Sequence, residues 1–535
     1  MRSRSRIVAL LTLAGATAVG TAVVHASSSD RMTFSNVATA NEKAPGYAPP
    51  NKLSVELAEI VSAQGSTKLE NPADGVDYYG YDTNGRPMVP PVGSNVEAQK
   101  TEPDKNTYLV FEQGLKGADP AYDYGTHFLF QGHEAGSPGS VTRINLDADA
   151  AHRVTLIATQ TSAAAPLKTI DGSTWDPFAQ RLLFTNEGGA NGAVYQTTPV
   201  PGGPVDDISG QLGRAGFEGI QNDDRGNLYY VEDTGGAVGT GANARARRPN
   251  SFVYRFQPEN AADLRQGGRI QALQVLVAGA PLVFGPSADA DINAPGYLAL
   301  HQYGTSYPTK WIDLVTTDST TSLPGPDLNA LAKAKGATPF KRPENGNFRP
   351  GTRFAEFYFD ETGDTDNRTS AAASGGFGAL FKLVQSPSSD DGRISILYNG
   401  DQVHAGFDNL AFFSKDQLAA VEDAGDTLHT QRNALDSAWL FDVTADYSNP
   451  ANQPIRFIAE ARDPSATIDS GLSGSSGFTN DGDNEITGIH VSDGDPSVQG
   501  ILGAKTPQPF RPDGHWRAFW TQQHGDNITW ELIVR

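Results

Sequence analysis

The sequence has no cysteine among its 535 residues. Disulfides, thiol nucleophiles, zinc–thiolate sites and iron–sulfur clusters are therefore excluded. A chain of this length can bury a core large enough to be stable without covalent cross-links. Any catalytic or metal chemistry must then depend on oxygen and nitrogen side chains.

Positive charge is also scarce. The chain has 41 Lys and Arg against 62 Asp and Glu, and its formal net charge is −21. Nucleic acids and anionic membranes require a basic surface, so neither is an expected partner. After the N-terminal segment, no run approaches the ~20 apolar residues needed to span a bilayer, and no stable membrane insertion is expected.

The N-terminal segment has the pattern of a signal peptide. Arg2, Arg4 and Arg6 precede an apolar run from residue 7 to residue 24, and a small-residue cleavage pattern ends at Ala26. A membrane anchor is the alternative, but the run is only weakly apolar, which favours cleavage after Ala26. No twin Arg is present, so a Sec-type route is expected. The mature protein is predicted to be secreted, either extracellular or periplasmic.

The remaining chain divides into two parts that differ in composition. Residues 27–74 are polar and predict a tail and cap, with one short helical pattern at 54–61. From residue 75 to residue 535, short aromatic and β-branched runs alternate with Gly, Asp, Asn and Pro, which is typical of many short strands joined by turns. We therefore predict one all-β domain over 75–535.

The strand-like runs form repeats. Glu218 precedes Glu232 by 14 residues, Asp408 precedes Glu422 by the same spacing, and each repeat begins with Gly-Phe-acid. Looser copies bring the number of units to about six, and most contain a third apolar run. Repeated units without interleaved helices predict a six-bladed β-propeller with short helical insertions, one of them at 328–335. A pair of β-sandwiches is the alternative.

This repeat should bring acids together. In an antiparallel hairpin, the start of the first strand and the end of the second lie at the same edge. The acids of several blades would then converge on one mouth of the channel, where cations must offset their repulsion. Carboxylate and amide oxygens favour calcium. Asp and Glu after a strand can equally be simple turn residues. His133 and His524 are possible extra ligands, although a lone His is more often packed or exposed.

The motifs together resemble the PhoX-type alkaline phosphatase family, secreted propeller phosphatases with an iron–calcium cofactor. The resemblance is carried, in order along the chain, by Gly132-His133-Glu134, Gly172-Ser173-Thr174-Trp175 with Glu187, Phe217-Glu218-Gly219, Glu232-Asp233, Arg342-Pro343-Glu344, Asp408-Asn409, Glu485-Ile486-Thr487-Gly488 and Gln523-His524. The family's best-known members ligate iron through a cysteine just before the Gly-x-Thr-Trp-like segment. Lys168-Thr169-Ile170-Asp171 stands there, so calcium is expected and the missing cysteine argues against iron.

The resemblance and the repeats together define the candidate site. Arg342 is the candidate catalytic residue, as a bidentate clamp on phosphate; a salt bridge to a blade carboxylate is its alternative role. The candidate metal ligands are Glu134, Glu187, Glu218, Glu232, Asp233, Glu344, Asp408, Asn409, Glu422, Asp423 and Glu485.

Three functions fit this candidate site. The first is a metal-dependent phosphatase acting on small phosphomonoesters outside the cell. The second is a calcium-dependent lactonase or esterase of the propeller type. The third is a non-catalytic, calcium-stabilised binding protein.

Overall fold

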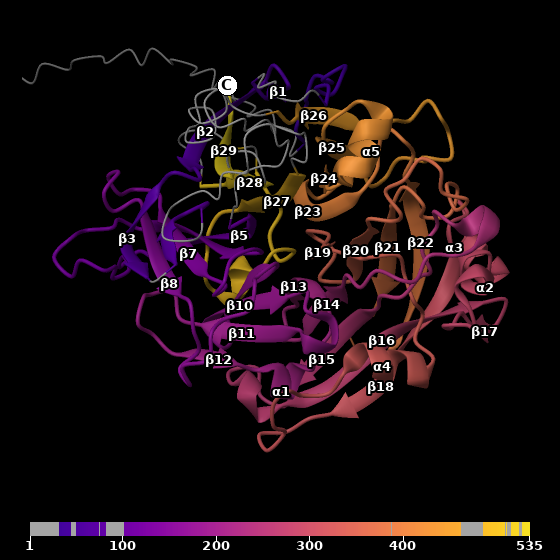
Figure 1. Ribbon diagram of the computed structural model, residues 1–535, viewed down its shortest axis with the longest axis horizontal. Coiled ribbons are helices and arrows are strands. Elements are labelled where there is room, and N and C mark those ends of the chain that lie inside the picture. Colours follow the sequence, from indigo (N-terminus) through magenta and orange to yellow (C-terminus); the bar gives the residue numbers. More distant parts are fainter. Residues whose placement is uncertain are drawn as a thin grey trace, which may run out of the picture.

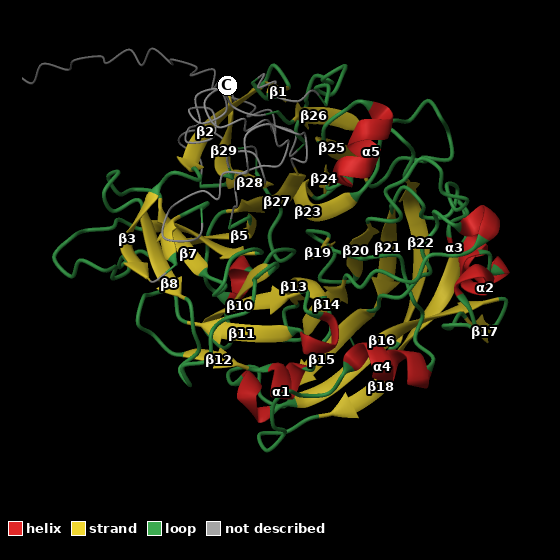
Figure 2. Ribbon diagram, viewed as in Figure 1, coloured by secondary structure: helices red, strands yellow, loops and turns green. Residues whose placement is uncertain are grey.

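The structure is a computed structural model, and strands dominate it (Figures 1 and 2). It describes residues 31–43, 50–73, 75–81, 101–386, 388–461, 485–508, 510, 515–523 and 527–535. The predicted signal peptide at 1–26 and His524 lie outside these residues. Within the described ranges, no helix has the length and apolar character needed to cross a membrane.

Two four-stranded antiparallel sheets contain strands β5 to β12. One has the order β5-β6-β7-β8 and the other β12-β11-β10-β9. Their strands are β5 (Pro103–Val110), β6 (His127–His133), β7 (Val141–Asn145), β8 (Val154–Ala158), β9 (Ser173–Asp176), β10 (Arg181–Asn186), β11 (Ala193–Thr197) and β12 (Val205–Asp207).

The third sheet joins two such sets of strands through the long strand β18. Its path is β13-β14-β15-β16-β18-β22-β21-β20-β19, with β17 paired to β16. These strands are β13 (Phe217–Asn222), β14 (Leu228–Glu232), β15 (Val253–Pro258), β16 (Gly268–Val277), β17 (Ala280–Pro281), β18 (Ser306–Thr316), β19 (Gly346–Phe348), β20 (Glu356–Glu361), β21 (Ala379–Gln385) and β22 (Asp391–Asn399).

The last two large sheets combine C-terminal strands with N-terminal ones. Their orders are β1-β26-β25-β24-β23 and β2-β29-β28-β27, and β3 pairs separately with β4. The strands are β1 (Lys52–Leu53), β2 (Leu57–Ala63), β3 (Lys68–Ala73), β4 (Val76–Tyr78), β23 (Phe407–Ser414), β24 (Gln417–Glu422), β25 (Ser437–Asp442), β26 (Ile455–Ala459), β27 (Glu485–Ser492), β28 (Arg517–Gln523) and β29 (Ile528–Val534).

The first strands of successive sets contact one another in a closed ring. β5 contacts β9, β9 contacts β13, β13 contacts β19, β19 contacts β23, β23 contacts β27, and β27 contacts β5. Figure 1 shows β5, β13, β19, β23 and β27 nearest the centre of the molecule. The predicted all-β class is confirmed, and this arrangement is consistent with a propeller.

Short helices lie toward the outside of the sheets (Figure 2). They are α1 (Ser209–Leu212), α2 (Ala288–Ile292), α3 (Pro295–Leu300), α4 (Leu328–Lys335) and α5 (Gly425–Arg432). The helical insertion expected at 328–335 is confirmed as α4. Asp327 caps it by accepting a hydrogen bond from the Ala330 amide, and Gly336 ends it in the left-handed conformation.

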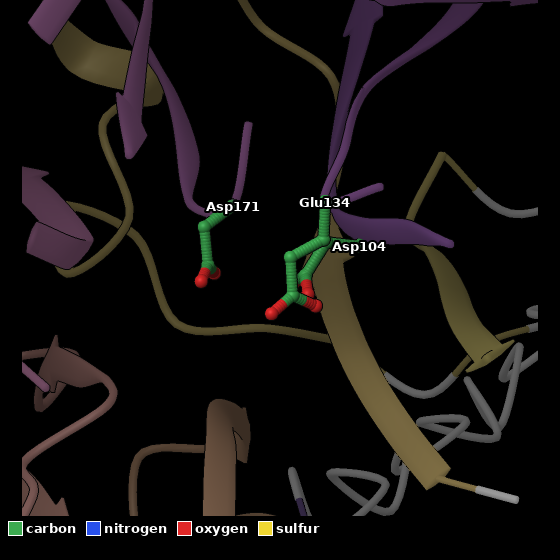
Figure 3. A group of neighbouring side chains, drawn as sticks. All are labelled: Asp104, Glu134 and Asp171. Atoms are coloured by element: carbon green, nitrogen blue, oxygen red, sulfur yellow. The ribbon is translucent and has the colours of Figure 1, made fainter. Parts of the chain in front are cut away.

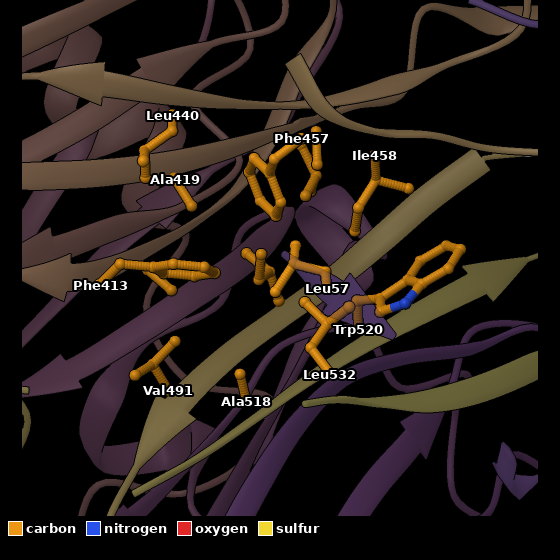
Figure 4. Close-up of a cluster of buried hydrophobic side chains, with 14 of the residues drawn as sticks. Leu57, Phe413, Ala419, Leu440, Phe457, Ile458, Val491, Ala518, Trp520 and Leu532 are labelled. Carbon is orange, nitrogen blue, oxygen red and sulfur yellow. The ribbon is translucent and has the colours of Figure 1, made fainter. Parts of the chain in front are cut away.

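The helix expected at 54–61 is wrong, because this segment contributes strand β2. Leu57 pairs with Val534 and Ile60 with Glu531, so β2 is hydrogen-bonded to β29. Leu57 is buried in a core cluster with Phe413, Phe457 and Trp520 (Figure 4). Pairing and burial of this kind override a weak local helical preference.

Candidate metal centre

Seven carboxylates form one linked cluster at the inner strands. Three groups each have carboxylate oxygens within 4.8 Å of one another. The groups are Asp104, Glu134 and Asp171; Asp171, Glu187 and Glu218; and Glu218, Glu344 and Asp408. Asp171 and Glu218 each belong to two groups and connect them. We call these seven residues the carboxylate cluster, and Figure 3 shows the first group facing a common space.

Each member lies on an inner strand or where a neighbouring strand begins or ends. Asp104, Glu218 and Asp408 lie on β5, β13 and β23, the first strands of their sets. Glu134 and Glu187 directly follow the second strands β6 and β10. The predicted meeting of hairpin edges is therefore realised for these residues.

Glycine at position 172 sets the spacing between Asp171 and Glu218, the two residues that connect the groups. A Cβ atom added there would lie 2.1 Å from the backbone oxygen of Glu218. The same oxygen accepts a hydrogen bond of 2.5 Å from the Thr185 hydroxyl. Only a residue without a side chain allows this approach, which places Asp171 beside Glu218.

Burial makes the cluster electrostatically costly in the absence of cations. Burial, followed by the charges of Asp104 and Glu187, raises the pKa of Asp171 well above its usual value. Burial, followed by Asp171 and Glu344, has the same effect on the pKa of Glu218. The Oδ1 atom of Asp171 is buried without a hydrogen-bond partner. Carboxylates in this state favour a bound cation, which restores their charged form.

The donor set fits a hard cation. The carboxylate cluster offers only oxygen atoms, which calcium prefers. His133 is not available, because its Nδ1 lies 2.9 Å from the Thr101 hydroxyl and its Nε2 lies 2.8 Å from the Thr142 hydroxyl. Burial lowers the pKa of His133 to about 3, so it is a neutral packed residue.

Arg342 lies against the third group. Its Nε donates to both carboxylate oxygens of Asp233, at 3.0 and 2.8 Å, and its Nη2 lies 3.0 Å from Oε1 of Glu344. Its backbone has φ +58, in the left-handed region. Although burial acts in the opposite direction, Asp233 and Glu344 raise the pKa of Arg342 well above its usual value. The salt bridge named as an alternative role is therefore present, and it fixes the guanidinium beside the cluster.

Two predicted ligands point elsewhere. The Glu232 carboxylate accepts hydrogen bonds from Tyr254 and Asn329, at 2.7 and 2.8 Å. The Glu422 carboxylate accepts from the Trp439 indole at 2.9 Å and pairs with Arg432 at 3.1 Å. Successive strand residues face opposite sides. In the pairs Glu232-Asp233 and Glu422-Asp423, the Glu side chain therefore points toward its own sheet. Neither Glu belongs to the three groups.

The other predicted residues lie beside the cluster. Asp233 holds Arg342, and the charge of Asp423 acts on Arg342, Glu344 and Asp408. Asn409 donates to the Asp408 carboxylate at 2.8 Å, and its carbonyl oxygen accepts from Asn345. The charge of Glu485 raises the pKa of Asp104, after burial and Glu134.

Sequence reasoning missed Asp104, Asp171 and Lys105. Asp104 precedes Gly132, the first residue of the motifs that carry the family resemblance. Asp171 stands where the family resemblance implied a lost cysteine ligand, yet its carboxylate belongs to two groups. Lys105 is buried, and its ammonium donates to Oδ1 of Asn345. Alternation along β5 could not have given the direction of Asp104 and Lys105, because the register of β5 against β6 shifts between Pro103 and Asn106.

The raised carboxyl pKa values predict how the metal-free protein responds to pH. Because these groups hold protons in the folded state that the unfolded chain releases, the free energy of unfolding should fall as pH rises above the usual carboxyl range. Thermal melts in chelator should therefore show a melting temperature that decreases from about pH 5 to about pH 8. Saturating calcium should flatten this slope. A melting temperature that rises with pH in chelator would contradict the prediction.

Comparison with known families supports the PhoX resemblance that the order of the motifs indicated. A family model described as alkaline phosphatase PhoX matches residues 203–492, more than half of the chain. The protein therefore belongs to the PhoX family, and the predicted enzyme class, a hydrolase of phosphomonoesters, is confirmed. A search of curated proteins found no match.

Comparison with solved structures agrees with the fold. A structure of Pseudomonas fluorescens PhoX in complex with vanadate, a transition state analogue, matches 93% of this chain and 98% of its own, with a TM-score of 0.52 and 11% identity. At this identity the likeness concerns the fold alone. The WD40 domain of Toxoplasma gondii coronin matches 91% of this chain and 89% of its own, with a TM-score of 0.34 and 8% identity. A luciferin-regenerating enzyme matches 81% of this chain and 91% of its own, with a TM-score of 0.36 and 6% identity.

Proposed function

We propose that this protein is an exported phosphatase that hydrolyses small phosphomonoesters at a calcium-rich centre in a six-bladed propeller. The observation that carries the proposal is the linked carboxylate cluster with Arg342 fixed at its edge. Family membership supports the reaction class. The ring of contacts among β5, β9, β13, β19, β23 and β27 supports six blades. Export after Ala26 is proposed from the N-terminal sequence pattern.

The proposed roles follow from the chemistry of the side chains. The carboxylate cluster would hold the cations, with Asp233, Asn409, Asp423 and Glu485 beside it. Bound cations would polarise the phosphoryl oxygens and neutralise developing charge. Arg342 would bind the phosphoryl group of the substrate. Its Nε donates to Asp233 and its Nη2 pairs with Glu344, and the side chain is 25% exposed. The exposed part of the guanidinium is suited to donating to a phosphate oxygen.

Glu344 connects cation binding with substrate binding. It belongs to the third group and also pairs with Arg342 at 3.0 Å. The Pro343 between them fixes the backbone, and both side chains reach the same place. The guanidinium would therefore be aligned before substrate arrives, which is what stabilisation of transition-state charge requires.

The function is tested by three assays on one preparation. In the presence of calcium, the protein should hydrolyse an aryl phosphate, and a lactone and an aryl ester should react far more slowly. Turnover of the lactone or ester without the phosphate would replace the phosphatase proposal with the lactonase or esterase. Tight calcium binding with none of the three activities would favour the non-catalytic binding protein.

Metal content is expected to distinguish this protein from an iron enzyme. The chain has no cysteine, and the carboxylate cluster has only oxygen donors. Elemental analysis of protein purified without added metal should therefore find calcium and only substoichiometric iron. A stoichiometric iron content would mean that oxygen and nitrogen ligands had replaced the thiolate, and the expectation would be wrong.

A further inference from the structure

Arg342 has a backbone conformation that arginine rarely adopts. Its φ is +58, in the left-handed region that crowds the Cβ atom of any residue other than glycine. Such a conformation persists only where surrounding contacts impose it. The backbone sets the direction of the Cα–Cβ bond, so relaxation of Arg342 to an ordinary conformation would turn its side chain away from Asp233 and Glu344. The contacts that impose this conformation therefore decide where the guanidinium points.

The end of β20 and the residues directly after it supply these contacts. The Thr362 amide donates to the carbonyl oxygen of Arg342 at 2.9 Å, and the Gly363 amide donates to that of Lys341 at 3.3 Å. In the opposite direction, the Lys341 amide donates to Oε1 of Glu361 at 2.8 Å. These bonds fix both peptide planes that flank the Cα atom of Arg342.

The Lys341 side chain adds an ion pair to this arrangement. Its ammonium lies 2.9 Å from Oδ2 of Asp364, and the two side chains are only 1% and 0% exposed. A lysine buried at this level requires a compensating charge, which Asp364 supplies. Asp364 also accepts from the Thr369 hydroxyl at 2.6 Å and from the Arg247 amide at 2.8 Å. Lys341 is therefore anchored to a carboxylate that is itself held from two other loops.

Glu361 is also fixed on its far side. It accepts from the Tyr297 hydroxyl at 2.9 Å, and its Oε2 lies 3.0 Å from Nε2 of His301. A Cβ atom added at Gly375 would lie 2.5 Å from Oε2 of Glu361 and 2.8 Å from Nε2 of His301, so the chain packs directly against this pair. Neither Glu361 nor Asp364 belongs to the three carboxylate groups. These contacts therefore reach the site through the backbone of Arg342.

We propose that Lys341, Glu361 and Asp364 are positioning residues, which hold Arg342 in its left-handed conformation and thereby aim the guanidinium at the phosphoryl group. This inference rests on the phosphate-binding role proposed for Arg342. Loss of one of these contacts keeps the guanidinium but lets its backbone relax, and a displacement of about 1 Å can lower turnover by about 10²-fold. The effect of Lys341 on turnover must then depend on the presence of Arg342.

A double-mutant cycle between Lys341 and Arg342 tests this dependence. At saturating calcium, Lys341→Met should lower turnover of an aryl phosphate by roughly 10-fold to 10²-fold and should keep the wild-type calcium content. In the Arg342→Ala background the same substitution should have no further effect, because no guanidinium remains to be positioned. Glu361→Gln should keep the turnover that Glu361→Ala loses, since its amide oxygen can still accept from the Lys341 amide.

Thermal melts of each variant monitor folding, because loss of one partner of a buried ion pair lowers stability. If Lys341→Met does not fold, the combination of Lys341→Met with Asp364→Asn removes both charges and replaces it in the cycle. Arg255→Met is the matched control. Arg255 lies on β15, is 1% exposed, and donates to Gln271 at 2.9 Å and to Asp390. Its loss should lower the melting temperature and leave turnover unchanged.

The outcomes separate this inference from the proposed function. If the wild type is active and Lys341→Met keeps full turnover, the inference is overturned while the proposed function stands. The same conclusion follows if Lys341→Met lowers turnover equally with and without Arg342, because the lysine would then act independently of the guanidinium. If the wild type hydrolyses no aryl phosphate, the proposed function fails and this inference fails with it.

Discussion

Excess chelator is expected to lower the melting temperature of this protein by on the order of 10 °C relative to saturating calcium. An ion that binds only the folded state, at a thousandfold excess over its Kd, stabilises that state by about 4 kcal/mol. More than one such ion is expected, because the carboxylate cluster contains three linked groups. Calcium would also relieve the repulsion among carboxylates that burial has brought together.

Two glutamates of one hairpin provide the matched comparison. Glu218 belongs to two groups, so Glu218→Gln should lose most of the calcium-dependent rise in melting temperature. Glu232 lies on the adjacent strand but is hydrogen-bonded within its own sheet, so Glu232→Gln should keep that rise. Overlapping melts of the wild type with calcium and with chelator would refute the calcium centre.

Removal of the Arg342 guanidinium is expected to lower turnover of an aryl phosphate by roughly 10²-fold or more, as the loss of one preorganised donor typically does. Arg342→Ala should retain its metal, because arginine is not a ligand and its loss leaves Asp233 and Glu344 more negative. Arg342→Lys should recover only part of the activity, since a point charge cannot reproduce a planar fork. Elemental analysis beside steady-state kinetics measures both effects.

Two further variants define what the Arg342 result means. Glu344→Gln should lose metal and activity together, because Glu344 belongs to the third group. Arg349 is the control. It also pairs with two carboxylates, those of Glu356 and Asp416, but neither belongs to the carboxylate cluster, so Arg349→Ala should keep wild-type turnover. Full activity in Arg342→Ala would assign Arg342 to a purely structural salt bridge.

Local patterns predicted the parts of the site that lie at hairpin ends. Glu134, Glu187, Glu218, Glu344 and Asp408 could be found because each occupies a recurrent place beside a strand. The direction of side chains was harder to foresee. Glu232 and Glu422 are adjacent to Asp233 and Asp423, which lie beside the cluster, yet their own side chains point elsewhere. The register shift in β13 between Phe217 and Ile220 also changes which side chains face the centre, and it is not visible in the sequence.

Contacts between distant segments explain the remaining differences. Asp171 enters the cluster because Gly172 allows its strand to approach the backbone of Glu218, and no local pattern encodes that distance. Lys105 would ordinarily be assigned to a solvated strand face. The strand at 57–63 has a helical spacing that its pairing with β29 overrides. The helix at 328–335 was predictable because its cap and its terminal Gly336 are local.

The pairing of β2 with β29 has a consequence for synthesis. The second strand of the chain cannot find its partner until the last strand has been made, since Leu57 pairs with Val534. The sheet formed by β2, β29, β28 and β27 thus closes only when the last strand is available, and its closure requires a contact between residues far apart in the sequence, which is entropically slow. An open, incompletely folded chain is the form that a Sec-type channel would thread, so late closure would suit the export proposed for this protein.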